Sequence, residues 1–197
     1  MKKCIREGAD VQARNIHLWT SLHFAAQGGN IQIGTFLVEQ NLDVEAVNKN
    51  GQTPLHIASA FGHKDMVQLL LKRNIDVKAV DYSVKTPLHF AAQNGHTNVI
   101  KLLLKNKASP ASTDVLGCMP IHYAIVFNHR EATEILLAEQ SINASVVLRG
   151  FTALHVSAEN GQLELVNLFL KKKANVNAKT DRLAAALHTA SLHGHLA

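Results

Sequence analysis

The chain has 197 residues, a hydrophobic content of 47% and a formal net charge of +5 at pH 7. Its apolar runs are too short to span a bilayer, and its first residues lack the apolar middle of a secretory signal. We therefore expect a cytoplasmic protein by default, with a secreted parent left open. Two cysteines, Cys4 and Cys118, are too few for a disulfide framework and favour a reducing compartment.

One histidine recurs at a constant interval along the chain. Each of these histidines lies thirty-three residues from the next: His23, His56, His89, His122, His155 and His188. A fixed period of this length is typical of a stacked repeat array, in which each unit is too small to bury its own apolar face. The pattern predicts one elongated module.

Each unit is predicted to open with a short helix that contains this histidine. In the second unit Thr53 suits the N-cap and Pro54 suits the first helical position, so we expect a helix from Pro54. The apolar residues that follow are assigned to the stack. Gly62 ends the helix, because glycine adopts a left-handed conformation without strain. The other units carry Gly29, Gly95, Asn128, Gly161 and Gly194 at this position, and asparagine is the next most tolerant residue.

A second helix follows in each unit. Apolar residues spaced three and four apart place one stripe on it, at 66, 67, 70 and 71, again at 99, 100, 103 and 104, and again at 165, 166, 169 and 170. Two short helices with one apolar face each form a thin layer, and only stacking gives these side chains a dry interior. Truncating one buried leucine to alanine would cost about 2 to 5 kcal/mol.

The motif around each histidine carries a family resemblance. The segments read Thr-Pro-Leu-His or variants of it, at 20–23, 53–56, 86–89, 119–122, 152–155 and 185–188. This pattern resembles the ankyrin repeat over essentially the whole chain. The resemblance implies an all-α solenoid with a β-turn and two antiparallel helices per unit, which binds other proteins on its concave side and brings no enzyme chemistry. It places complete units at 15–47, 48–80, 81–113, 114–146 and 147–179, between the tail of a preceding repeat (1–14) and a partial sixth repeat (180–197).

Two features of the array depart from a regular repeat. Both ends cut through a unit, so we expect a piece of a longer array with a poorly held sixth unit. The turn before the motif holds glycine in three units, whereas Leu18, Val84 and Leu183 occupy the same position in the others. The turns at these three residues are therefore in doubt.

The histidines do not predict a metal site. A metal needs ligands that converge on one point, whereas the motif places one histidine in each layer. In the ankyrin resemblance this histidine forms hydrogen bonds within and between units, which suits a ring with one donor and one acceptor nitrogen. The chain also lacks a nucleophile elbow, a phosphate-binding loop and a zinc-protease motif. We expect no metal, no cofactor and no catalysis.

The positions that an ankyrin array leaves free for a partner are the turn tips and the last two residues of the first helix. At these positions the chain has His17, Trp19, Lys49, Asn50, Gln52, Phe61, Tyr82, Lys85, Gln93, Asn94, Leu116, Val126, Phe127, Arg149 and Phe151. Five aromatic residues are among them, and exposed aromatic residues are typical of interface hot spots. The leading hypothesis is a monomeric module that binds another protein, with Phe61, Tyr82 and Phe127 as central anchors.

Three alternatives stay open. The aromatic residues of neighbouring units could pack on one another and only stabilise the array. The array could be a spacer in a larger membrane-acting protein, such as a channel, a toxin or a secreted effector. The pI near 9.3 also raises nucleic acid as a partner. The lysines at 72, 105, 107 and 171–173 follow the second helices and are not interleaved with stacking aromatic residues, which disfavours nucleic acid.

Overall fold

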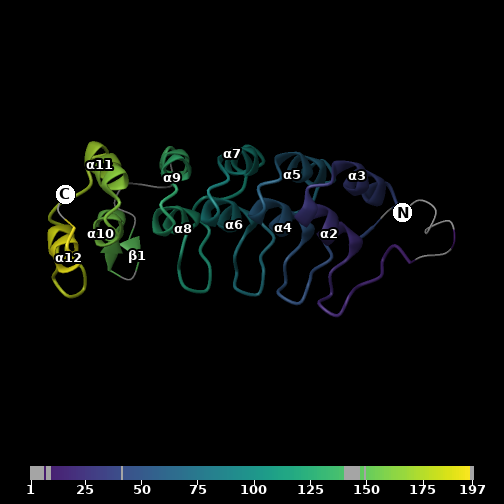
Figure 1. Cartoon of the computed structure of the whole chain (residues 1–197), viewed down its shortest axis with the longest axis horizontal. Coiled ribbons are helices and arrows are strands. Elements are labelled where there is room, and N and C mark those ends of the chain that lie inside the picture. The colour runs from purple at the N-terminus through teal and green to yellow at the C-terminus, as the bar shows by residue number, and fades with distance from the viewer. Residues whose placement is uncertain (1–6, 8–9, 41, 140–146, 149, 196–197) are drawn as a thin grey trace.

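The computed structural model describes residues 7, 10–40, 42–139, 147–148 and 150–195 (Figure 1). These residues form the all-α solenoid that the sequence predicts, with a single short hairpin in the described part of the chain. The elements are α2 (Ser21–Gly28), α3 (Ile31–Glu39), α4 (Pro54–Ala60), α5 (Lys64–Leu71), α6 (Pro87–Gln93), α7 (Thr97–Lys105), α8 (Pro120–Val126), α9 (Arg130–Leu137), β1 (Val147–Leu148), β2 (Phe151–Thr152), α10 (Ala153–Glu159), α11 (Leu163–Lys171) and α12 (Ala186–Leu192).

The helices are arranged in two parallel rows. Figure 1 shows α2, α4, α6, α8 and α10 in an inner row, with α3, α5, α7, α9 and α11 in an outer row above it. Each inner helix packs on its own outer helix and on the inner helix of the next layer. The connecting turns project from the inner row on the side away from the outer row. We number the layers from one, starting with α2 and α3.

The buried apolar residues lie between the layers. Leu55 of α4 and Met66 and Leu70 of α5 have no exposed surface, which confirms the predicted stripe of the second layer. In α11 Phe169 is equally buried, but Leu170 is 43% exposed, so the stripe predicted there is too wide by one residue. Since no layer encloses its own core, each depends on its neighbours for a dry interior.

The motif histidine sets the start of each inner helix. Pro54 begins α4 as predicted, and the N-cap Thr53 precedes it. The N–H of Thr53 donates to Nδ1 of His56 at 3.1 Å, and the threonine hydroxyl lies 2.9 Å from the same nitrogen. The backbone contact is also present where the N-cap is Met119 or Ala185. The histidine ring therefore defines the helix start, and the expected hydroxyl cap is not needed.

The same ring joins each layer to the next. Because the N-cap N–H can only donate to Nδ1, the proton of the neutral ring sits on Nε2. This nitrogen donates to a carbonyl twenty-nine residues further along the chain, at 2.9 to 3.0 Å: His23 to Gln52, His56 to Lys85, His89 to Cys118 and His155 to Ala184. One side chain thus orders its own helix and holds the turn of the following layer.

Burial makes four of the motif histidines sensitive to pH: His23, His56, His89 and His122. Desolvation lowers the pKa of His56 and of His122 to about 4, and it also lowers the pKa of His23 and His89. A proton on Nδ1 would also face the N–H of the N-cap residue. The folded chain therefore holds these rings in the neutral form.

We predict a loss of stability between pH 6.5 and about pH 4. In this range the histidines of the unfolded chain bind protons, whereas the buried histidines of the folded chain stay neutral. The free energy of unfolding is therefore greatest above pH 6.5 and decreases as the pH falls. At pH 5 the loss from His56 alone should be about 2 kcal/mol. Thermal melts of the wild type and of His56→Gln measure the effect, because the variant should have a shallower pH dependence. The matched control His17→Gln removes an exposed histidine and should keep the wild-type slope.

The turns that lack glycine are nevertheless formed. Leu18, Val84 and Leu183 have φ values of 59°, 60° and 62°, in the same left-handed region as Gly51 at 77° and Gly117 at 77°. The doubt about these turns was therefore wrong, because the hydrogen bonds of each turn hold the residue in this conformation. Val84 N–H, for example, donates to the Asp81 carbonyl at 2.9 Å. A β-branched residue is strained there.

Replacing Val84 with glycine should raise stability by about 1 kcal/mol, because it removes a left-handed β-branched residue at a partly exposed site. The reverse exchange in the next layer, Gly117→Val, should lower stability by about 1 to 2 kcal/mol. No atom lies within 4 Å of a Cβ built on Gly117, so this variant isolates the conformational cost. Urea unfolding of both variants measures the change. A neutral Gly117→Val would show that the turn is not strained.

A second set of contacts repeats across the layers and is broken once. In four of these contacts a histidine ring covers the glycine that lies thirty-four residues earlier, so closely that an added Cβ would lie 2.5 to 2.7 Å from the ring. The pairs are Gly29 with His63, Gly62 with His96, Gly95 with His129, and Gly161 with His195. Between layers four and five the pair is Asn128 with Gln162. Since a side chain at 128 excludes the ring, both residues differ together.

The contact between layers four and five, here called the seam, is weakly bonded. His63, His96 and His129 donate to carbonyls at 2.9 to 3.0 Å, whereas Gln162 Nε2 lies 3.5 Å from the Val126 carbonyl. The Oε1 of Gln162 and the Nε2 of His122 are buried without a hydrogen-bond partner. Each such atom costs about 1 to 3 kcal/mol.

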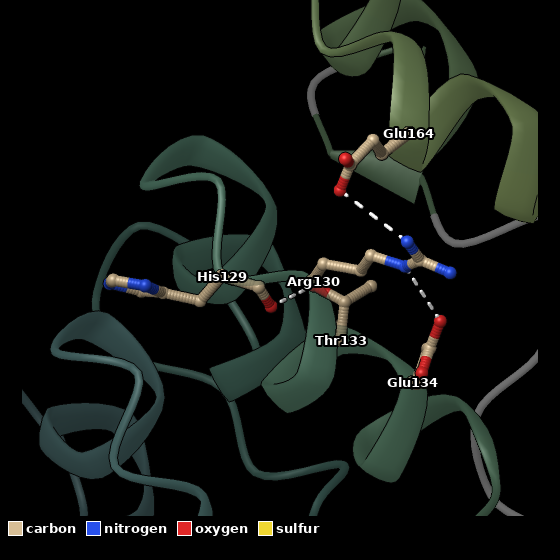
Figure 2. A network of polar contacts seen from close by, with 5 residues as sticks. All are labelled: His129, Arg130, Thr133, Glu134 and Glu164. Atoms are coloured by element: carbon tan, nitrogen blue, oxygen red, sulfur yellow. Dashed lines mark hydrogen bonds and ion pairs between the residues drawn. The ribbon is translucent and has the colours of Figure 1, made fainter.

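Surface ion pairs bridge the seam. Figure 2 shows Arg130 at the start of α9 between Glu134 on its own helix and Glu164 on α11. Its Nε lies 2.9 Å from Glu134 and its Nη1 lies 3.4 Å from Glu164. A cleft of about 280 Å³ between α9 and α11 is lined by these three side chains and by Lys171. Because all of these groups are exposed, the pairs add little stability and do not replace the missing histidine bond.

We predict that the exchanges Asn128→Gly and Gln162→His are strongly coupled. Gln162→His alone should not stabilise the chain, because the new ring meets the Asn128 Cβ. With glycine at 128 the new histidine ring can pack on residue 128 as the His129 ring packs on Gly95, and it can donate to the Val126 carbonyl. The double variant should then exceed the sum of the single variants by about 0.5 to 3 kcal/mol. Denaturant unfolding of the four proteins measures this coupling, and strictly additive changes would contradict the steric explanation.

Candidate functional site

Backbone hydrogen bonds tie the turn tips of the first four layers together. The N–H of Lys49 donates to the His17 carbonyl, and the N–H of Tyr82 donates to the Asn50 carbonyl, both at 3.0 Å. The next step repeats the pattern, since Val115 N–H donates to the Ser83 carbonyl at 3.0 Å. These bonds bring residues that are far apart in the sequence onto one continuous surface. We call this surface, formed by the turn tips and the ends of the inner helices, the strip.

Most of the predicted binding residues lie on the strip with at least part of their surface open. Phe61, Tyr82 and Phe127 are 50%, 72% and 49% exposed. Exposed with them are His17, Lys49, Asn50, Asn94, Leu116 and Val126, whereas Trp19, Gln52, Lys85, Gln93 and Phe151 are half-buried. Arg149 lies outside the described residues.

The aromatic rings of the strip are each held on one side. Phe61 stacks on His63 with ring centroids 6.3 Å apart and an interplanar angle of 6°, and Phe127 lies in the same way against His129. Tyr82 covers Gly51 so closely that an added Cβ would lie 2.5 Å from its ring. Within the described chain, no ring pair joins two of the five predicted aromatic residues. Each ring is thus positioned by its own surroundings.

Three further aromatic residues lie on the strip that were not predicted from the sequence. Phe24, Phe90 and Tyr123 directly follow the motif histidine and were assigned to the stack. Phe24 is 52% exposed and packs on Trp19 with centroids 5.1 Å apart, and the other two are half-buried. Their common position in the thirty-three-residue repeat was the available signal. It did not reveal them because the residue at this position in the second unit, Ile57, is aliphatic and was assigned to the stack.

A polar hollow of about 300 Å³ lies on the strip between the turns of layers two and three. It is lined by Lys49, Asn50, Gln52, Asp81, Tyr82, Ser83, Lys85 and Phe90. Five of these residues are predicted binding residues. A larger hollow of about 460 Å³ is apolar, lies among α10, α11 and α12, and contains none of the predicted binding residues.

The acids of the strip are used within the turns. Oδ1 of Asp81 accepts the N–H groups of Ser83 and Lys85, both at 2.9 Å. Asp114 holds its own turn in the same way and also accepts the Tyr123 hydroxyl at 2.6 Å. Although partial burial opposes ionisation, this hydroxyl and the turn N–H groups lower the pKa of Asp114. Burial and the same bond raise the pKa of Tyr123. Both carboxylates are therefore committed to the backbone.

The lysine of the third turn has an ordered ammonium group. Lys85 Nζ lies 4.2 Å from the centroid of the Tyr123 ring and 5.9 Å from that of Phe90. Its backbone donates to Asp81 and accepts the Nε2–H of His56. Cation–π contacts of this kind are worth about 0.5 to 2 kcal/mol. The ammonium group of Lys85 is thus held against the Tyr123 ring of the fourth layer, and the residue also lines the hollow.

Comparison with known families agrees with this geometry. Residues 1–81 and 80–149 match a family described as ankyrin repeats in three copies, and residues 149–181 match the ankyrin repeat. The chain belongs to the ankyrin repeat family. A search of curated proteins found no match.

Membership of the ankyrin repeat family sets the general expectation for this surface. Ankyrin repeats are generally protein–protein interaction modules and are typically non-catalytic. Among the residues that the structure describes, no group of histidine, cysteine and acidic side chains could hold a metal ion. Over the same residues, no helix combines the length and the apolar character that crossing a membrane requires.

Proposed function

We propose that the chain is a non-catalytic module that binds a partner protein on the strip, with Phe61, Tyr82 and Phe127 as the central contacts. This proposal rests on one observation about the three rings. Each ring has about half or more of its surface exposed, and each is packed on one face against a histidine ring or a glycine. An aromatic group that is already ordered loses little conformational entropy on binding. Such residues commonly provide most of the energy of an interface.

The backbone ladder between the turns supports the same proposal. It spaces the side chains of four successive layers at fixed intervals, so a partner meets a surface that does not have to reorganise. The strip runs across the layers, which suits an extended segment or a helix of a partner better than a small molecule. We expect the array to act as a monomer.

The triple variant Phe61→Ala, Tyr82→Ala and Phe127→Ala tests the proposal. Binding of a partner captured by affinity purification should weaken by at least about 100-fold, because hot-spot truncations cost about 2 kcal/mol or more. The melting temperature should change little, since these rings lie outside the core. The matched control Leu163→Ala with Leu170→Ala removes exposed apolar groups from α11 and should leave binding intact.

Other results would favour the other hypotheses. If stability decreases while binding persists, the rings serve the fold. If binding of the partner is lost only in the Leu163→Ala, Leu170→Ala variant, the partner binds at the apolar hollow instead. A spacer in a larger membrane-acting protein predicts no partner whose binding depends on the strip. Nucleic acid as the partner predicts a steep loss of affinity with salt.

A further inference from the structure

The strip has an unbalanced charge over its first four layers. Its basic groups include Lys49 and Lys85, whose ammonium groups form no ion pair with a carboxylate of the described residues. The acids on this part of the strip, Asp81 and Asp114, are buried and accept turn N–H groups. The exposed surface here is therefore positive, and an acidic partner would complement it.

The polar hollow between layers two and three concentrates this charge. Lys49 and Lys85 contribute two positive charges to its wall and Asp81 contributes one negative charge, which leaves a formal charge of +1. Gln52 uses Oε1 to accept the Asn48 amide at 3.2 Å, so that its NH2 group remains to donate. The Ser83 hydroxyl adds another donor to the lining.

The hollow is also preorganised. Lys85 is fixed at its backbone by Asp81 and His56, and its ammonium group is ordered by the rings of Tyr123 and Phe90. The opposite wall is the turn of Lys49, which is joined to the next turn by the bond from Tyr82 N–H to the Asn50 carbonyl. An anion that enters would meet in Lys85 a residue whose backbone and ammonium group are already ordered, and this reduces the entropic cost of binding.

We propose that this hollow binds the side-chain carboxylate of an aspartate or glutamate in the partner segment that lies on the strip. The inference rests on the proposed function and names the chemistry of the partner. A monoanion matches the formal charge of the hollow. A phosphate dianion would face the Asp81 carboxylate with an excess of negative charge, and the lining residues include no arginine to grip it in a bidentate manner.

Selection from a phage-displayed library of random twelve-residue peptides tests this inference on the intact chain. The enriched peptides should share an aspartate or glutamate at one position, with apolar or aromatic residues nearby for Phe61 and Phe127. The probes are then the enriched peptides, synthesised with acetylated and amidated ends so that no terminal carboxylate can occupy the hollow. Fluorescence anisotropy measures their affinity.

Replacing the shared acid with its amide should weaken binding by about tenfold, because one charge pair is lost in a half-buried site. Lys85→Met should cause the same loss, and in this variant the amide peptide should bind as well as the acidic one. Lys85→Arg should retain most of the affinity. Lys72→Met removes a lysine at the end of α5, far along the layer from the hollow, and should have no effect. Cooperative melting curves show that the variants fold, with a small decrease in stability expected for Lys85→Met because it loses the contact with Tyr123.

The failures can be told apart. If the peptides lose affinity with Phe61→Ala and Phe127→Ala but tolerate the amide exchange, the strip binds peptides and the carboxylate hollow is wrong. A phosphoserine peptide that binds more tightly than the glutamate peptide also overturns the inference. If no peptide is enriched, or if binding ignores the phenylalanine variants, the proposed function is wrong together with the inference.

Discussion

The two hydrogen bonds of the motif histidine are the contact on which the rest of the array depends. Nδ1 accepts from the residue that starts the inner helix, and Nε2 donates to a carbonyl in the turn of the next layer. Apolar packing between layers supplies most of the stability, but it is not directional and cannot by itself fix the spacing of the turns. The hydrogen bonds of the histidine are directional, and they fix the position of each inner helix relative to the turn of the next layer. The regular spacing of the strip is a consequence.

The seam shows what happens when this contact is missing. His122 has no acceptor for Nε2, and Asn128 and Gln162 replace the usual glycine and histidine. Layers four and five are then joined by apolar packing, a long amide contact and exposed ion pairs of Arg130. The ladder of turn bonds runs through the first four layers, before the seam. The part of the strip with the most regular geometry is therefore also the part that contains the polar hollow.

The sequence predicts the features of the fold that depend on neighbouring residues. The helix start at Pro54, the left-handed residue at Gly62 and the stripe of α5 follow from local rules. The turn at Val84 was misjudged, because the hydrogen bonds within the turn outweigh the preference of a β-branched residue against a left-handed conformation. Contacts between layers were harder to predict. Nothing local reveals that a ring thirty-four residues away covers each glycine, and the hollow exists only because two turns lie side by side.

The position of Lys85 separates what the fold requires from what it leaves free. The carbonyl of residue 85 accepts the histidine bond, and the equivalent carbonyls belong to Gln52, Cys118 and Ala184. Side chains as different as lysine, glutamine, cysteine and alanine thus serve the stack equally well, because only their backbone takes part. The histidine bond does not need the positive charge at 85, which instead contacts the Tyr123 ring of the fourth layer. The ammonium group lies against the rings of Tyr123 and Phe90, and Lys85 also lines the hollow, where we propose that it meets an acidic group of a partner.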